Sequence, residues 1–250
     1  MEKGTDNVSA IRFSGVGKHY GNAIALADFS LDITHGEFFG LVGANGAGKT
    51  TLIKCLLDFC DLGAGAITIS GIAHGKTAAR SGMAYLPERF NPPHFLTGRD
   101  FLQYMASLHG VAYEENAARD VLSRLDLDYA ALDKPARAYS KGMTQKLGLA
   151  ACLLSGKPLL LLDEPTSGLD PKARALLKQE LKRAHRSGRT IVLTSHALPD
   201  VEEMCTRMAV LHAGRLLFCG SPADFLSTHR AASMEQAYLA SIGEVPVSPA

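Results

Sequence analysis

The residues best suited to chemistry lie in one glycine-rich stretch that follows a short apolar run. The stretch reads Gly43, Ala44, Asn45, Gly46, Ala47, Gly48, Lys49, Thr50 and Thr51. It fits the spacing G-x-x-x-x-G-K-[ST], in which glycines let backbone N–H groups curl around phosphate oxygens without clashes from a Cβ atom. We therefore expect a nucleotide-binding loop in which Lys49 reaches the β and γ phosphates and Thr50 places its hydroxyl on Mg²⁺.

The segments on either side of this loop agree with that interpretation. Residues 37–42 are mostly apolar, as in a buried strand, and the segment from Thr51 onward has the pattern of a helix. Because the N-terminus of a helix carries a partial positive charge, it would face the same phosphates.

A pair of carboxylates forms the second chemical signal. Residues 159–162 are four leucines, and Asp163, Glu164 and Pro165 follow them directly. At the end of a buried strand, Asp163 is placed to hold Mg²⁺ through water and Glu164 to polarise an attacking water. Since neighbouring side chains on a strand point to opposite faces, we expect the two carboxylates to have different roles.

Tyr20 is a candidate platform for a nucleotide base. It lies in the turn-rich segment 17–22, between two segments with partial strand alternation, 8–16 and 25–33. An aromatic ring at such a tip can stack on adenine. The alternative is a tyrosine half-buried at the end of a strand.

The remaining pattern predicts an α/β protein. Strands are expected at 65–71, 83–87, 159–162, 190–194, 208–212 and 216–219, and helices at 171–186 and 199–205. Between residues 98 and 155 apolar residues recur at helical spacing, which indicates an inserted helical subdomain, with the proline-rich segment 88–95 as a hinge before it. The alternation of strands and helices favours a mainly parallel, covered sheet, and we expect residues 243–250 to form a flexible tail.

Composition excludes several classes of protein. The chain has 250 residues, 46% of them hydrophobic, and a formal net charge of +1, so it has no global field that would attract nucleic acid. The polar start at residues 1–7 argues against a secretory signal, and no apolar stretch is long enough for a membrane span. Five scattered cysteines are expected to be reduced and mostly buried, as in a cytosolic protein.

Taken together, these motifs resemble the ATP-binding cassette (ABC) ATPases. The phosphate loop, the Asp163–Glu164 pair, the segment Ser167-Gly168-Leu169-Asp170 and the segment Thr194-Ser195-His196 occur in the family's order. The resemblance covers residues 8–240. It implies a P-loop NTPase core with a mainly parallel sheet, at about 8–87 and 157–220. It also implies an N-terminal antiparallel β-subdomain and a helical subdomain at about 88–156.

The segment Ser140-Lys141-Gly142-Met143-Thr144-Gln145 is similar to the signature segment of this family. Ser140 would cap the helix that runs through residues 147–154, and its hydroxyl and the Gly142 N–H would face a γ-phosphate bound by another subunit. Because one chain has one phosphate loop and one signature segment, the resemblance implies a head-to-tail dimer. That dimer is a homodimer or a pair with a second ABC ATPase. The simpler alternative is that Ser140 is only a helix cap.

The resemblance also implies roles for individual residues. His196 would contact the γ-phosphate and orient the water together with Glu164, and Asp170 would contact the partner's phosphate loop or simply begin the following helix. Two positions depart from the family pattern. Glu88 stands where a glutamine usually senses Mg²⁺, and Lys141 stands in place of a glycine.

The expected function is that of the ATP-hydrolysing subunit of a membrane transporter, with ATP and Mg²⁺ as cofactors. The permease would be a separate chain that holds this subunit at the cytoplasmic side of the inner membrane. Similarity to bacterial exporter-type cassettes suggests export. One alternative is a soluble ABC-type ATPase acting on ribosomes or nucleic acid, which would usually carry two cassettes or a coiled coil. A regulator without turnover is disfavoured by Glu164 and His196.

Overall fold

The structure is a computed structural model that describes residues 9–243. The predictions made for residues 1–8, and for all but Gly243 of the tail predicted at 243–250, lie outside this range. The chain divides into two compact units, one formed by residues up to 81 and from 192 onward, the other by residues 82–191. The predicted boundaries of the helical subdomain at 88 and 156 stay a prediction.

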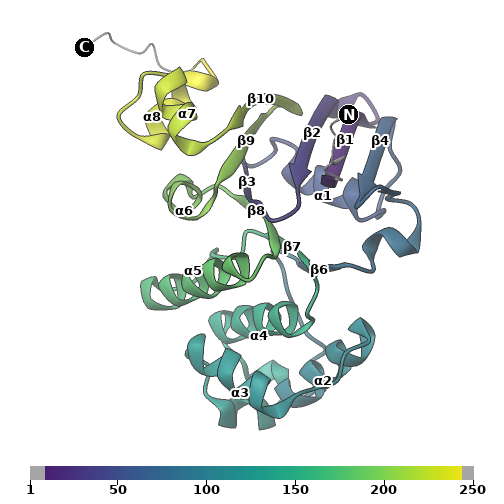
Figure 1. The fold of residues 1–250 in the computed structure, drawn as a ribbon, viewed down its shortest axis with the longest axis vertical. Helices are drawn as coiled ribbons and strands as arrows, with labels where there is room; N and C mark the ends of the chain where they lie inside the picture. Colours follow the sequence, from purple (N-terminus) through teal and green to yellow (C-terminus); the bar gives the residue numbers. More distant parts are fainter. Residues whose placement is uncertain (1–8, 244–250) are drawn as a thin grey trace, which may run out of the picture. The chain divides into compact units, whose positions relative to one another are not determined.

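An antiparallel sheet opens the first unit (Figure 1). Its strand order is β2-β1-β4-β5, and the strands are β1 (Ser9–Tyr20), β2 (Ala23–Thr34), β4 (Ala64–Ile69) and β5 (Ile72–Ala73). The N-terminal antiparallel β-subdomain is therefore confirmed. The turn predicted at 17–22 is shorter in the structure, because β1 and β2 remain paired as far as Tyr20 and Ala23. Only Gly21 and Asn22 remain in the turn.

A parallel pair of strands carries the phosphate loop in the same unit. β3 (Phe38–Val42) pairs in parallel with β9 (Arg207–His212), and β10 (Arg215–Gly220) returns antiparallel to β9. All five residues of β3 are buried, which explains its unbroken apolar sequence. The loop follows β3 and leads into α1 (Lys49–Leu56), as predicted.

Three further helices complete the first unit. They are α6 (Leu198–Met204), α7 (Pro222–Thr228) and α8 (Met234–Ser241). The sequence analysis assigned no element after residue 219, although Ser221 and Asp224 form a capping box that starts α7. Phe225 of α7 is fully buried, and its ring centroid lies 4.8 Å from that of Phe218 on β10. This contact anchors the C-terminal helices to the sheet edge.

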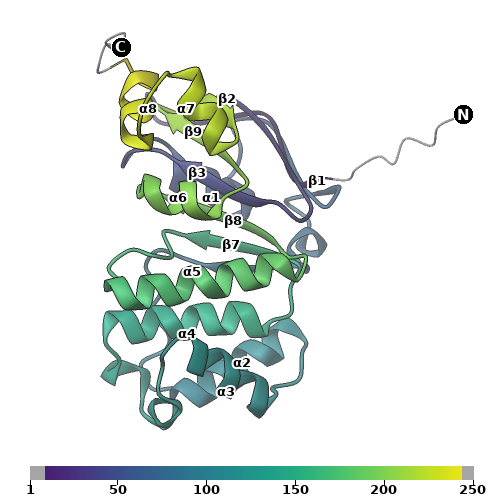
Figure 2. The ribbon, with the colours of Figure 1, turned by 60° about the vertical axis from the view of Figure 1, so that its left-hand side comes forward.

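The second unit places helices beside two parallel strands. β6 (Met83–Leu86) pairs with β7 (Leu159–Asp163), and β8 (Thr190–Ser195) begins at the end of this unit. The helices are α2 (Gly98–His109), α3 (Glu115–Arg124), α4 (Lys141–Leu154) and α5 (Pro171–Arg186). α4 packs against α2, α3 and α5 (Figure 2). Because α4 is covered on several sides, most of its residues are buried.

The α/β fold class is confirmed, with helices and strands alternating along the chain. All five cysteines are free thiols, three of them buried, and burial raises the pKa of Cys152 to about 12. Within residues 9–243, none of the helices combines the length and the apolar character needed to cross a membrane.

Candidate functional site

The phosphate loop depends on close backbone contacts that only glycine permits. A Cβ atom at Gly43 would meet the Ala47 Cβ at 2.9 Å and would overlap the Leu211 carbonyl at the end of β9. Gly48 has a φ of +115°, and a Cβ there would lie 2.7 Å from the Ala25 carbonyl oxygen. Gly48 is the N-cap residue of α1 and provides no side-chain hydrogen bond to the helix. The first N–H groups of α1 are therefore not covered by a capping side chain, as an anion site requires.

Lys49 lies inside the curve of this loop. Its side chain is buried, and its ammonium group donates hydrogen bonds to the carbonyl oxygens of Gly43 and Ala44. A buried positive charge within a glycine-rich loop suits the phosphates of a nucleotide. The geometry agrees with the expected place of Lys49.

Two hydrogen bonds from other elements support the loop. The Gly214 N–H, in the turn between β9 and β10, donates to the Ala47 carbonyl at 2.9 Å. The Ala44 N–H donates to the Tyr238 hydroxyl oxygen on α8 at 3.0 Å. Tyr238 was missed by the sequence analysis, because it lies 194 residues from Ala44 and belongs to no motif. The C-terminal helix is thus a direct support of the loop.

Tyr20 lies near the start of α1. Its side chain is half exposed, and its hydroxyl donates to the Cys60 sulfur at 3.8 Å. This hydrogen bond is the main cause of the raised pKa of Tyr20, whereas the Thr51 side chain acts to lower it. The strand pairing therefore brings the Tyr20 phenol to the first turn of the helix after the phosphate loop. Stacking of its ring on a base stays a prediction.

His196 also belongs to the first unit. It is exposed directly after β8, whose last residue, Ser195, is buried. The Ala197 N–H donates to the Ser195 Oγ at 2.9 Å, which holds the turn after His196. The predicted position at a strand end is confirmed, and its role toward a phosphate stays a prediction.

The two carboxylates lie in the second unit and are both buried, with Asp163 4% and Glu164 6% exposed. β7 ends at Asp163, so Glu164 lies in the turn and not on the strand as the sequence analysis assumed. Its φ of +49° is in the left-handed region, which is uncommon for a residue with a side chain. Such backbone strain clusters at functional sites. Asp163 is therefore the last residue of the strand, whereas Glu164 belongs to the turn that follows it.

Glu88 and Asp163 both raise the pKa of the Tyr85 phenol. Burial raises the pKa of Tyr85 to about 12, and the negative charges of Asp163 and Glu88 add to this effect. The parallel pairing of β6 and β7 thus brings Glu88 and Asp163 into one neighbourhood. Their carboxylates and the Thr50 hydroxyl are the hard oxygen ligands that Mg²⁺ prefers.

Residues 9–243 contain no cluster of three or more His, Cys, Asp or Glu side chains that would hold a metal alone. Mg²⁺ in ATPase sites needs only one or two carboxylates, because substrate phosphates complete its shell. Within the second unit, the carboxylates of Asp163 and Glu88 are the type of donor that fits the ion.

The signature segment begins α4. The Ser140 Oγ accepts a hydrogen bond from the Met143 N–H at 3.2 Å, so its predicted role as a helix cap is confirmed. A Cβ atom at Gly142 would approach no atom of the chain closer than 3.9 Å, so packing within the chain does not require glycine there. The Lys141 side chain lies against Gly168, where an added Cβ would meet its Cε at 2.9 Å.

Two further contacts position this unit's motifs. Gln145, buried on α4, donates from its side chain to the Pro165 carbonyl at 3.2 Å and so links the signature helix to the turn after Glu164. The sequence analysis did not predict this role, because the two residues lie 20 positions apart in the chain. Asp170 caps α5, since its Oδ1 accepts from the Ala173 N–H at 2.9 Å.

Comparisons with known proteins agree with this geometry. The family model described as ABC transporter matches residues 26–167. An uncharacterised ABC transporter ATP-binding protein of Synechocystis is 40% identical over 206 residues, which are 81% of this chain and 58% of that protein. The Nod factor export ATP-binding protein I of Mesorhizobium japonicum is 35% identical over 235 residues, with 92% of this chain and 68% of that protein covered.

A solved structure, described as the ATP-binding subunit of an ABC transporter, has the same fold. Its TM-score is 0.85 at 28% sequence identity, and the match covers 94% of this chain and all of that one. By contrast, this chain spans only 58% of the length of the Synechocystis protein.

Replacing Tyr238 by Phe tests its support of the phosphate loop. The substitution keeps the ring but leaves the Ala44 N–H without this acceptor, so we expect a roughly two- to tenfold higher dissociation constant for ATP. Tyr104→Phe, at an exposed tyrosine on α2, is the matched control and should bind ATP as the unmodified chain does. Calorimetry measures both, and equal affinities in the two variants would show that Tyr238 does not position the loop.

Proposed function

Because this chain belongs to the ABC transporter family as an ATP-binding protein, we propose that it binds and hydrolyses ATP to drive a separate membrane permease. The proposal depends on one observation: the chain contains both a phosphate loop and a pair of buried carboxylates. One unit holds a phosphate loop curved around a buried lysine, and the other holds a buried Asp163 and a strained Glu164.

Nucleotide binding is assigned to the phosphate loop. Its N–H groups and the Lys49 ammonium hold phosphate oxygens, while Tyr20 provides an aromatic face for the base. Thr50 and Asp163 would hold Mg²⁺, and Glu88 would contact the ion or its water. When bound, Mg²⁺ neutralises charge that develops on the phosphate oxygens.

Glu164 is assigned as the general base of hydrolysis. Its carboxylate accepts a proton from the attacking water, and the strained turn fixes the direction in which the carboxylate points. His196 orients the same water and donates to the γ-phosphate. With both residues present, turnover is favoured over a purely regulatory role.

A head-to-tail dimer would complete the ATP site. Among the residues that the structure describes, no atom outside the local helix backbone would come closer than 3.9 Å to a Cβ atom at Gly142. An approaching phosphate on another subunit accounts for this glycine. Ser140 accepts one hydrogen bond as a cap and can donate its own proton to that phosphate. The second subunit is a further copy of this chain or another ABC ATPase, and Asp170 faces its phosphate loop.

The permease would contact the segment around residues 90–95 and the neighbouring helices. Phe95 is 82% exposed there, as expected for an apolar side chain that a partner covers. One relative is named as an export protein, and this supports export as the direction of transport. The permease would hold the chain at the cytoplasmic side of the cell membrane. A ribosome- or nucleic-acid-bound ATPase has no comparable support in the relatives reported above.

Glu164→Gln tests the assignment of the base. The amide cannot accept the proton, so phosphate release should fall by about 10²- to 10⁴-fold while ATP binding and ATP-dependent dimerisation persist. Glu202→Gln, at an exposed glutamate of α6, serves as the control and should leave turnover unchanged. Normal phosphate release from Glu164→Gln would remove Glu164 from the mechanism.

Purification from detergent-solubilised membranes of the host tests the transporter assignment. A stoichiometric polytopic membrane protein should accompany the tagged chain. Its recovery should fall in Phe95→Ala but not in Phe59→Ala, which removes a similarly exposed ring from the other unit. Recovery of the chain only with ribosomes or nucleic acid would contradict the assignment.

A further inference from the structure

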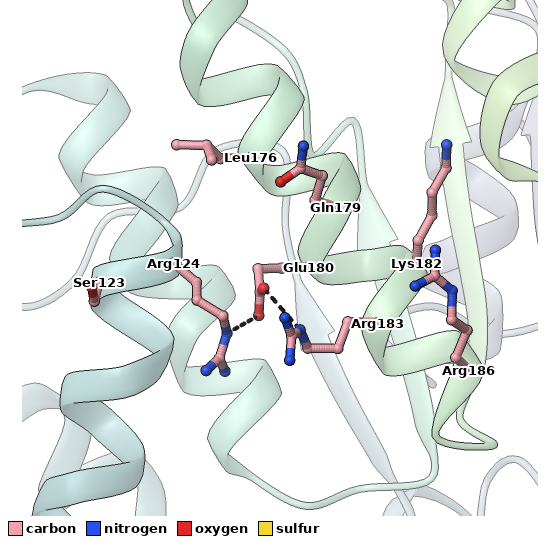
Figure 3. Close-up of a pocket in the computed structure, with 8 residues that line it drawn as sticks. All are labelled: Ser123, Arg124, Leu176, Gln179, Glu180, Lys182, Arg183 and Arg186. Atoms are coloured by element: carbon pink, nitrogen blue, oxygen red, sulfur yellow. Dashed lines mark hydrogen bonds and ion pairs between the residues drawn. The ribbon is translucent and has the colours of Figure 1, made fainter.

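The ion pairs around Glu180 in the second unit have a structural explanation. In a cavity of about 500 Å³ between α3 and α5, the Glu180 carboxylate accepts from the Arg124 Nε at 2.8 Å and lies 3.3 Å from the Arg183 Nε (Figure 3). These contacts join the two helices. By contrast, a pair of cysteines in the first unit, Cys55 and Cys60, has chemistry that the proposed ATPase cycle does not use.

The sulfur atoms of Cys55 and Cys60 lie 3.6 Å apart. Cys55 is fully buried on α1, the helix that follows the phosphate loop. Cys60 is partly exposed in the segment after this helix. A short shift of one side chain would therefore bring the two sulfur atoms to bonding distance.

The turn at the end of α1 brings the two cysteines together. Asp58 has a left-handed backbone with a φ of +62°, and its N–H donates to the Cys55 carbonyl at 3.1 Å. The Phe59 N–H donates to the Lys54 carbonyl at 2.8 Å. This pair of hydrogen bonds is the Schellman ending of a helix, which reverses the chain. The backbone therefore returns Cys60 toward Cys55.

The two thiols differ in access to solvent. Burial raises the pKa of Cys55 to about 12, and the neighbouring Cys60 adds to this effect, whereas the charge of Lys18 acts to lower the pKa. Cys55 is thus protonated at neutral pH. Because Cys60 is partly exposed, it is the sulfur that a dissolved oxidant reaches. Cys55 lies directly behind it, where it can attack a modified Cys60.

Cys60 also contacts the proposed platform for the base. The Tyr20 hydroxyl donates to the Cys60 sulfur at 3.8 Å. The Lys18 ammonium lies 5.2 Å from the centroid of the Tyr20 ring and donates to the Asp61 carbonyl at 2.6 Å. The segment that contains Cys60 is therefore tied to the end of β1 that carries Tyr20.

From these observations, we propose that Cys55 and Cys60 form a reversible disulfide within the chain, and that this bond weakens ATP binding through Tyr20. The bond draws the Cys60 sulfur toward α1, so the Tyr20 hydroxyl loses its acceptor. Formation of the disulfide depends on the two thiols alone. Its effect on ATP rests on the proposed function, in which Tyr20 stacks on the nucleotide base.

The oxidant in this proposal is a small disulfide, such as glutathione disulfide. The Cys60 thiolate attacks one of its sulfur atoms, which forms a mixed disulfide and releases one small thiolate. Cys55 gives its proton to that thiolate, attacks the Cys60 sulfur and releases the second small thiolate. The two protein thiols thus lose two electrons and two protons, and the small disulfide is reduced to two thiols.

Peptide mapping of the folded chain after incubation with glutathione disulfide tests the first step of the proposal. Trypsin cleaves after Lys54 and Lys76 and leaves both cysteines in the peptide 55–76. With remaining thiols alkylated and no reductant added, this peptide should weigh two hydrogens less than its reduced form. Excess dithiothreitol before alkylation should reverse the change. A peptide 55–76 in which both cysteines stay free would overturn the proposal.

Single variants test the order of the two steps. Cys55→Ala should keep glutathione on Cys60, because no thiol remains to displace it. Cys60→Ser should take up no glutathione at the buried Cys55. The matched control is Cys219→Ser, which removes another partly exposed cysteine and should form the disulfide as the unmodified chain does. Glutathione on Cys55 in the Cys60→Ser variant would contradict the assignment of Cys60 as the thiol that reacts first.

Calorimetry of the reduced and the oxidised chain tests the effect on ATP. We expect oxidation to raise the ATP dissociation constant roughly two- to tenfold, as the loss of one hydrogen bond implies, and to have no such effect on Cys60→Ser. Equal affinities of the reduced and the disulfide-bonded chain would overturn the link through Tyr20. A reduced chain that binds no ATP would instead contradict the proposed function, and the mass of peptide 55–76 would still decide whether the disulfide forms.

Discussion

The functional centre depends on how closely the backbone of the phosphate loop approaches its neighbours. Gly43 passes against the end of β9 and Gly48 against Ala25 of β2, at distances that exclude a Cβ atom. This close passage curves the loop around the Lys49 ammonium, and the turn between β9 and β10 holds the curve through the Ala47 carbonyl. The loop is therefore held by contacts from three parts of the chain: the buried parallel strands, the β-subdomain and the C-terminal helix α8.

In the second unit, too, the backbone conformation positions the proposed site. The short strand β7 ends directly before Glu164, the residue that we assign as the base, and Glu164 lies in a strained turn. β7 is buried throughout, and the chain turns sharply at Glu164. Gln145 ties this turn to the helix that begins at Ser140. Whatever meets Ser140 and Gly142 is therefore connected by a short path to Glu164. In the proposed dimer, this path would link the neighbouring subunit to the residue that we assign as the base.

Motifs and periodicity predicted much of this arrangement. The phosphate loop, the leucine strand before Asp163 and the capping roles of Ser140 and Asp170 each depend on residues close in sequence. Three features could not be predicted in this way. Tyr238 and Gln145 act through contacts between distant segments, and the left-handed backbone at Glu164 arises where a buried strand must end. The length of the first hairpin was also missed, because strand pairing overrides the local turn preference of residues 17–20.

The central claim is that one chain holds only part of an ATP site, which a second subunit completes. Mixing two inactive variants, Lys49→Ala and Ser140→Arg, tests it most directly through phosphate release. In a head-to-tail dimer of one chain of each kind, one site combines an intact phosphate loop with an intact signature segment. The mixture should therefore recover activity well above the sum of the two separate variants. If the two variants co-purify as one dimer, a mixture no more active than that sum would contradict the shared site.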